Sequence, residues 1–141
     1  MNINIRNLGK NDYAQFIKLI DTNVSIENYE KFINNLSSTH IIIIAEYENK
    51  IIATGTLLIE PKLTHNICYM GHIENIFVDN EYRNRGVGKD IVQYLKNYAV
   101  KYGCYRIDLV CEEKLEKFYG NMGFTKKQLG MTMFIEKNFK I

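Results

Sequence analysis

The segment Arg83–Lys89, with the sequence RNRGVGK, has the residue types and spacing best suited to chemistry in this chain. It follows an apolar run that ends at Val78 and precedes an amphipathic helical pattern, which predicts a strand, a tight turn and a helix start. Gly86 and Gly88 permit positive φ and leave no Cβ between the backbone and a ligand. Backbone N–H groups at a helix N-terminus, with cations nearby, bind anions and above all phosphate. We therefore predict a phosphate site at this turn.

Two commoner glycine motifs do not fit the same segment. A Walker loop requires Gly where this chain has Arg83, and Ser or Thr where it has Asp90. A dinucleotide-binding fingerprint requires a third Gly at Ile91. If the six residues from Arg83 to Gly88 are considered without their flanks, one alternative remains: a basic turn at a helix start that binds no ligand.

Length and composition bound the other possibilities. A chain of 141 residues suits one domain, residues 1–141, and its net charge of +2 gives no reason to expect nucleic-acid binding. We see no apolar stretch long enough to span a membrane and no secretory signal. Three cysteines without C-x-x-C spacing favour a reducing, cytoplasmic location. His40 and His72 have no metal-ligand spacing with them, so we expect no metal.

The periodicity predicts a chain of the α/β (α+β) class. Its elements follow the order β-α-α-β-β-β-α-β-α-β, with a possible further strand at the C-terminal end. The predicted strands cover residues 3–7, 40–47, 51–59, 68–78, 104–111 and 124–137. Helices are expected after Asn11 or Asp12, after Ser25, from Gly86 to Gly103, and over 113–122. The strand–helix–strand unit over 68–111 requires a parallel right-handed crossover, so a mixed, mostly antiparallel sheet with helices on both faces follows.

From about residue 52 to residue 124 the chain resembles the GNAT superfamily of N-acetyltransferases. The turn matches its pyrophosphate loop, and Phe118-Tyr119-x-x-x-Gly123-Phe124 matches a second superfamily pattern. Two further segments, residues 71–74 (GHIE) and 103–105 (GCY), resemble its eukaryotic-type glucosamine-6-phosphate N-acetyltransferases in particular. The resemblance implies the GNAT fold with a splayed pair of parallel strands. It also implies a homodimer in which the C-terminal strand helps to build the partner's site.

The activity implied by the resemblance is transfer of acetyl from acetyl-CoA to the 2-amino group of glucosamine 6-phosphate, a step toward UDP-N-acetylglucosamine. No Ser/His/Asp or Cys/His nucleophile set is visible, so direct transfer through a ternary complex is expected. The expected partner is therefore a small amino-sugar phosphate. Two alternatives stay open: a GNAT that acetylates another small amine or a protein N-terminus, and a non-catalytic acetyl-CoA-binding module.

The resemblance assigns a set of positions to the cofactor. The glycine turn would cradle its pyrophosphate, and a strand segment before the turn would pair with its pantetheine arm. The cofactor positions are Ile76, Phe77, Val78, Asn84, Arg85, Gly86, Val87, Gly88, Lys89, Tyr119, Gly120 and Asn121.

Catalytic roles are implied for three side chains. Tyr119 would stabilise or protonate the departing thiolate. An acid that the family usually has is replaced here by Val110, so Asp108 or Glu74, and less so Glu112, would accept the proton of the amine. A backbone N–H near Glu74 would polarise the thioester carbonyl.

The sugar phosphate would contact a third set of positions, which offers cations, hydroxyl groups and amides. These positions are Lys62, Leu63, Thr64, His65, Glu74, Asn75, Tyr105 and Arg106. The family more often has Asp in place of Asn75, and it has Glu and Arg where this chain has Gly130 and Phe134. Because of these differences from the family, another small amine or a protein N-terminus stays open as the acceptor.

Overall fold

The computed structural model describes residues 1–136 and divides the chain into two compact units. The first unit is Met1–Leu109 and the second begins at Val110.

The first unit contains one five-stranded sheet in the order β1-β2-β3-β4-β5. All neighbours are antiparallel except β4 and β5, which are parallel. The strands are β1 (Asn4–Asn7), β2 (His40–Tyr47), β3 (Lys50–Lys62), β4 (Cys68–Val78) and β5 (Cys104–Leu109). The helical elements of this unit are η1 (Lys10–Asp12), α1 (Tyr13–Ile20), α2 (Ile26–Asn34), η2 (Asn80–Tyr82) and α3 (Val87–Tyr102). The mixed, mostly antiparallel sheet predicted from the sequence is confirmed.

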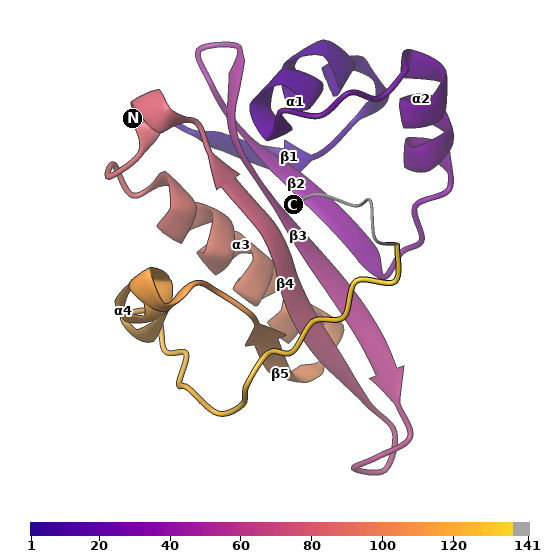
Figure 1. Ribbon diagram of the computed structural model, residues 1–141, viewed down its shortest axis with the longest axis vertical. Helices are drawn as coiled ribbons and strands as arrows, with labels where there is room; N and C mark the ends of the chain where they lie inside the picture. Colours follow the sequence, from indigo (N-terminus) through magenta and orange to yellow (C-terminus); the bar gives the residue numbers. More distant parts are fainter. Residues whose placement is uncertain (137–141) are drawn as a thin grey trace. The chain divides into compact units, whose positions relative to one another are not determined.

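Helices cover both faces of this sheet (Figure 1). On one face α3 lies over β3 and β4, because Ile91 and Leu95 approach the open backbone of Gly55. On the other face Ile42 and Ile44 of β2 belong to a buried cluster with Phe16 of α1. Successive side chains of β2 therefore point to opposite faces of the sheet and pack under different helices, as the two-residue period of a strand requires.

Local turn chemistry ends several elements where the sequence predicted. Glu48 and Asn49 have φ of 48° and 63° in the hairpin between β2 and β3. The hydroxyl of Ser25 accepts the N–H of Asn28 and caps α2. Gly103, with φ of 98°, ends α3 in the left-handed conformation typical of a helix C-terminus.

A partly buried ion pair ties β1 to the start of α1. Asp12 precedes α1, but its carboxylate does not cap that helix among the described residues. Instead the two nitrogens of the Arg6 guanidinium donate to its oxygens at 2.8 Å each, and the backbone N–H of Gly9 donates at 2.7 Å. The Arg6 hydrogen bonds hold the pKa of the Asp12 carboxyl below its usual value. The expected helix cap is therefore a strand-to-helix anchor.

The second unit contains η3 (Glu113–Leu115) and α4 (Glu116–Gly120). The helix expected over 113–122 is shorter than predicted, and β5 ends at Leu109 rather than at residue 111. The strand expected over 124–137 is wrong for residues 124–136, which form no strand, while Lys137 lies outside the described residues. A β-strand needs a neighbour for its backbone hydrogen bonds, and the sequence pattern alone does not show whether one is supplied.

No helix within residues 1–136 combines the length and the apolar composition needed to cross a membrane.

Candidate active site

The turn between β4 and α3 is built by short-range hydrogen bonds. The carboxylate of Asp79 accepts the N–H of Glu81 at 3.0 Å and starts η2. The Nε of Arg83 donates to the carbonyl of Val78 at 3.2 Å. Asn84 and Gly86 then take positive φ, at 61° and 83°. The chain thus turns twice within three residues before α3 begins at Val87.

The start of α3 presents unpaired backbone donors, as predicted. The first backbone bond of the helix runs from the N–H of Asp90 to the carbonyl of Gly86, at 3.0 Å. The N–H groups of Val87, Gly88 and Lys89 therefore have no intrahelical acceptor, and no side chain of the described residues caps this end. The helix dipole adds partial positive charge at the same point. This end of α3 suits an anion.

The two glycines of the turn have different roles, which corrects one sequence-based expectation. Gly86 has the predicted positive φ, and a Cβ placed on it would meet no described atom within 4 Å. Gly88 lies inside α3 and is not among the positive-φ glycines. Asn84 supplies the second left-handed residue, and Asn tolerates that conformation better than most residues.

Three cations surround this helix start without carboxylate partners. Arg83, Arg85 and Lys89 are exposed, and none forms an ion pair with any of residues 1–136. The guanidinium carbon of Arg85 lies 5.5 Å from the ring centroid of Tyr82. Free positive charge and free N–H groups at one turn indicate a phosphate ligand.

A β-bulge interrupts β4 just before this turn. Thr56 pairs with Glu74 and Thr54 with Phe77, so Gly55 alone faces both Asn75 and Ile76. Asn75 has φ of 52°. A Cβ on Gly55 would lie 2.8 Å from Cδ1 of Ile76, so the missing side chain makes room for the bulge.

The bulge lies where β4 and β5 part. The last pair between these strands is Ile73 with Leu109, whereas β4 continues to Val78. From Glu74 to Val78, the β5 side of β4 therefore has no strand partner within the first unit. The backbone donors and acceptors on this side of β4 have no β5 partner, and an extended ligand can pair with such groups.

Some of the predicted sugar-contacting residues contact neighbours from β3, β4 and β5. His72 hydrogen-bonds Glu60 across the β3–β4 pair at 2.9 Å, and Lys62 lies 3.6 Å from the same carboxylate. These partners, His72 foremost, lower the pKa of Glu60. The ring of His65 lies 5.2 Å from that of Tyr105 and joins the β3–β4 connection to β5.

Arg106 and Asp108 form a two-pronged ion pair on this face. The Nε and Nη2 atoms of Arg106 lie 3.0 and 3.1 Å from the two carboxylate oxygens of Asp108. Nη2 also approaches the sulfur of Met70 at 3.5 Å. Both oxygens of this carboxylate are therefore engaged by the guanidinium. Glu74, exposed and without an ion pair among the described residues, is the freer of the two candidate bases.

The structure does not bring all predicted sugar contacts together in one chain. Lys62 pairs with Cys68 at the start of β4, and residues 63–65 lie in the connection beyond it. From Cys68 to Asn75 the strand advances roughly 23 Å, at about 3.3 Å per residue. Residues 62–65 therefore lie farther from the bulge than a hexose phosphate can reach.

The second unit holds the remaining predicted cofactor positions, Tyr119, Gly120 and Asn121, at the end of α4. The Tyr119 ring is buried between Phe118 and Phe124, with centroids at 4.9 and 5.9 Å. Burial, with a smaller effect of Cys111, raises the pKa of its hydroxyl. Tyr119 therefore remains a proton donor at neutral and mildly alkaline pH.

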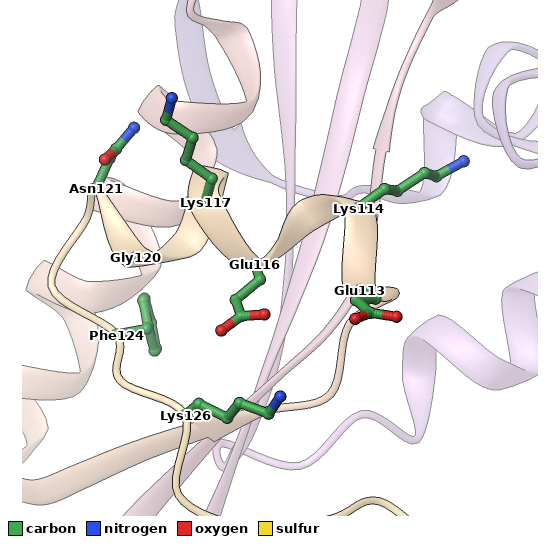
Figure 2. A pocket seen from close by; sticks show the side chains of 8 residues that line it. All are labelled: Glu113, Lys114, Glu116, Lys117, Gly120, Asn121, Phe124 and Lys126. Carbon is green, nitrogen blue, oxygen red and sulfur yellow. The ribbon is translucent and has the colours of Figure 1, made fainter.

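An open pocket of about 520 Å³ lies beside α4 and includes two of these positions. Its lining residues are Glu113, Lys114, Glu116, Lys117, Gly120, Asn121, Phe124 and Lys126. Figure 2 shows the carboxylates of Glu113 and Glu116 and the amine of Lys126 turned toward the same space. Lys114, Lys117 and Asn121 point away from it. Charges of both signs line this pocket, so its side chains alone do not select an anion.

Two of the positions that depart from the family pattern contact each other. A Cβ on Gly130 would lie 3.1 Å from Cγ1 of Val110. Both replace acidic residues of the resembled family, so the loss of charge is concentrated at one point of the second unit.

Sequence reasoning did not identify Gly55, Lys50 or Tyr82 as parts of the site. Gly55 acts through residues far along the chain, and only its position in a β-branched run marked it as unusual. Lys50 and Tyr82 are joined only by the fold. Within residues 1–136 no cluster of three His, Cys, Asp or Glu side chains has metal-binding geometry.

Comparison with known proteins agrees with this geometry. A family model described as "Acetyltransferase (GNAT) family" matches residues 11–124. The chain is 38% identical over 112 residues to glucosamine 6-phosphate N-acetyltransferase 1 of Dictyostelium discoideum, covering 78% of this chain and 71% of the relative. It is 33% identical over 106 residues to the Arabidopsis thaliana enzyme of the corresponding name, covering 74% and 71%. The crystal structure of the Arabidopsis enzyme superimposes with a TM-score of 0.92 at 29% identity, covering 96% of this chain and 100% of that one.

Proposed function

Because this chain belongs to the acetyltransferase (GNAT) family, we propose that it transfers acetyl from acetyl-CoA to the 2-amino group of glucosamine 6-phosphate. The products are N-acetylglucosamine 6-phosphate and coenzyme A. The observation that carries the proposal is the start of α3, whose free N–H groups and unpaired cations suit a diphosphate. The names of the curated relatives support the choice of sugar.

Acetyl-CoA would lie along the first unit, from the phosphate turn to the bulge of β4. Val87, Gly88 and Lys89 would bind its diphosphate through their N–H groups, with Asn84, Arg85 and Gly86 forming the rest of the turn. The pantetheine arm would extend along Ile76, Phe77 and Val78, where β4 has no strand partner on the β5 side. The thioester carbonyl would then lie at the bulge, where a backbone N–H can stabilise its developing negative charge.

The chemistry requires a neutral amine, an electrophilic carbonyl and a protonated leaving group. The amine nitrogen attacks the thioester carbon, and the C–S bond then breaks with both electrons on sulfur. We assign protonation of that thiolate to Tyr119, whose raised pKa keeps its O–H in place. Transfer is direct, so acetyl-CoA and the sugar occupy the site together.

The proton of the amine needs an acceptor. Glu74 adjoins the bulge and has a free carboxylate, whereas Asp108 is engaged by Arg106. We therefore propose Glu74, directly or through water, as the base and Asp108 as a partner that holds Arg106 in place.

The two groups of predicted sugar contacts are too far apart in one chain to bind the same sugar. In a homodimer, each site would be built from both chains. Glu74 and Asn75 would serve the chain's own site. Residues 62–65 would reach the site of a second copy, together with Tyr105, which contacts His65, and Arg106, which lies against Tyr105. The exposed apolar segment of the second unit supports this assembly, since it offers side chains that water does not favour. These side chains are Leu129, Met131, Met133, Phe134 and Ile135.

The wider context is also proposed. One family domain would span both compact units, since the family match continues past Leu109 to residue 124. A cytoplasmic location suits three cysteines that are free in the structure. The product would enter UDP-N-acetylglucosamine synthesis.

A thiol-release assay across acceptors tests the proposal. Acetyl-CoA is supplied with glucosamine 6-phosphate, glucosamine, a panel of small amines or a peptide with a free N-terminus. The proposal predicts release that is fastest with glucosamine 6-phosphate. Release only with a peptide or another amine would favour the alternative acceptor that Val110 and Gly130 suggest. Coenzyme A binding without turnover on any amine would favour a non-catalytic module.

A further inference from the structure

Tyr82 lies at the centre of a cluster that joins the β2–β3 hairpin to the phosphate turn. Its ring centroid lies 5.1 Å from Nζ of Lys50 and 5.5 Å from the guanidinium carbon of Arg85. The ring of Tyr47 packs on it at 6.1 Å and 69°. An aromatic ring within about 6 Å of a cation attracts that cation through its quadrupole. The Tyr82 ring therefore contacts one cation of the hairpin and one of the turn.

The hairpin cation is neutralised by acidic residues that precede the turn. Nζ of Lys50 lies 3.1 Å from Asp79 and 3.7 Å from Glu81. The hydrogen bond with Asp79 raises the pKa of Lys50, and the Glu81 N–H, together with Lys50, lowers that of Asp79. Because these carboxylates balance Lys50, its charge does not drive the Arg85 guanidinium from the ring.

Arg85 has no such carboxylate among the described residues. Its contact with Tyr82 therefore determines where its guanidinium lies before a ligand arrives. An arginine side chain loses considerable rotamer freedom when it binds a phosphate, and a stacked guanidinium has already lost part of it.

We propose that Tyr82, braced by Lys50, is a positioning residue that holds Arg85 ready to bind a phosphate of coenzyme A. The inference rests on the proposed function, because it needs the turn to bind this cofactor. It adds a side-chain clamp to a site otherwise built from backbone N–H groups. The phosphate is either one of the diphosphate or the 3′-phosphate, and both present the same anionic oxygens.

Calorimetric titration of coenzyme A into a set of variants tests the clamp. Arg85→Ala is expected to weaken binding about tenfold, and Tyr82→Leu about fivefold. Tyr82→Phe keeps the ring and is expected to bind coenzyme A as tightly as the unsubstituted protein. The double variant Tyr82→Leu/Arg85→Ala should bind no more weakly than Arg85→Ala alone, since Tyr82 acts through Arg85. Tyr94→Leu, an exposed tyrosine on α3, is the matched control and should change nothing.

Lys50→Met gives a second test in case Tyr82→Leu does not fold. It should weaken binding about twofold in the unsubstituted protein and have no effect in the Arg85→Ala background. Repeating the titrations with 3′-dephospho-coenzyme A identifies the phosphate. An Arg85 effect with both ligands assigns the diphosphate, and an effect with coenzyme A alone assigns the 3′-phosphate.

Unchanged affinity in Tyr82→Leu or Lys50→Met would overturn the proposal, and so would losses that multiply in the double variant. Failure of the unsubstituted protein to bind coenzyme A would instead overturn the proposed function. The two failures are therefore distinguishable.

Discussion

Gly55 and Ile76 face each other across the β3–β4 pair, where a Cβ on Gly55 would lie 2.8 Å from Cδ1 of Ile76. The same Cβ would lie 2.6 Å from Ile91 and 3.1 Å from Leu95 of α3. The bulge of β4 and the packing of α3 thus depend on one missing side chain.

Gly55→Ala is expected to lower the free energy of unfolding by about 2 kcal/mol, because the added methyl overfills a packed core. Chemical denaturation monitored by circular dichroism measures the change. Gly120→Ala is the matched control for stability: its added Cβ meets no described atom within 4 Å, and φ there is not positive. A loss in Gly55→Ala no larger than in Gly120→Ala would contradict the packing role.

The Arg6–Asp12 pair predicts a pH dependence of stability. Because the pKa of Asp12 is lowered on folding, its contribution is complete above its unfolded value, about 4, and is lost as pH falls through the folded value. Asp12→Asn is expected to lower the free energy of unfolding by about 1.5 kcal/mol at pH 7, because the partly exposed Arg6 weakens the pair relative to a fully buried one. Denaturant midpoints measured from pH 7 down to pH 3 should show this difference shrinking. A difference independent of pH would show that the charge of Asp12 does not stabilise the fold.

Removal of the Tyr119 hydroxyl separates catalysis from binding. Tyr119→Phe is expected to reduce kcat about a hundredfold, because the thiolate loses its proton donor. The affinity for coenzyme A, measured by calorimetry, should stay within twofold of the unsubstituted value, at about 0.4 kcal/mol or less. Since burial raises the Tyr119 pKa, the midpoint of any loss of activity from its ionisation should lie above pH 10, the ordinary tyrosine pKa. Phe118→Leu serves as a control for ring packing, and equal kcat losses in both variants would argue against a proton donor.

The two candidate bases have different predicted phenotypes. Glu74→Gln should lower kcat about a hundredfold, because the free carboxylate accepts the proton of the amine. Asp108→Asn loosens Arg106, so it should mainly raise the KM for the sugar, about fivefold. Steady-state kinetics with each substrate varied distinguish the two. A collapse of kcat in Asp108→Asn, with Glu74→Gln nearly normal, would reverse the assignment.

Much of the fold followed from local signals in the sequence. The apolar run of β4 gave the bounds Cys68–Val78 without error, because turn residues border it on both sides. Gly103 ended α3 and Asn49 lies in the hairpin turn, since Gly and Asn tolerate positive φ; Glu48 also takes positive φ there. The helix start after Gly86 was predicted by the same local logic.

What the sequence did not reveal depends on residues that meet only in the folded chain. The Asn75 bulge needs Gly55 from the neighbouring strand, and the Arg106–Asp108 pair needs both on one face of β5. Gly88 was expected to take positive φ, but helix α3 already includes it. The strand expected over residues 124–137 is not formed within residues 124–136, because pairing requires a partner that sequence periodicity cannot identify.

The destination of the acetyl group tests the central claim most directly. Acetyl-CoA labelled with ¹³C in the acetyl carbonyl is incubated with the protein and glucosamine 6-phosphate, and the reaction is followed by NMR. The account predicts that the thioester signal is replaced by an amide signal coupled to the proton on the 2-nitrogen of the sugar. A thioester signal that persists at the rate of a protein-free control would contradict it.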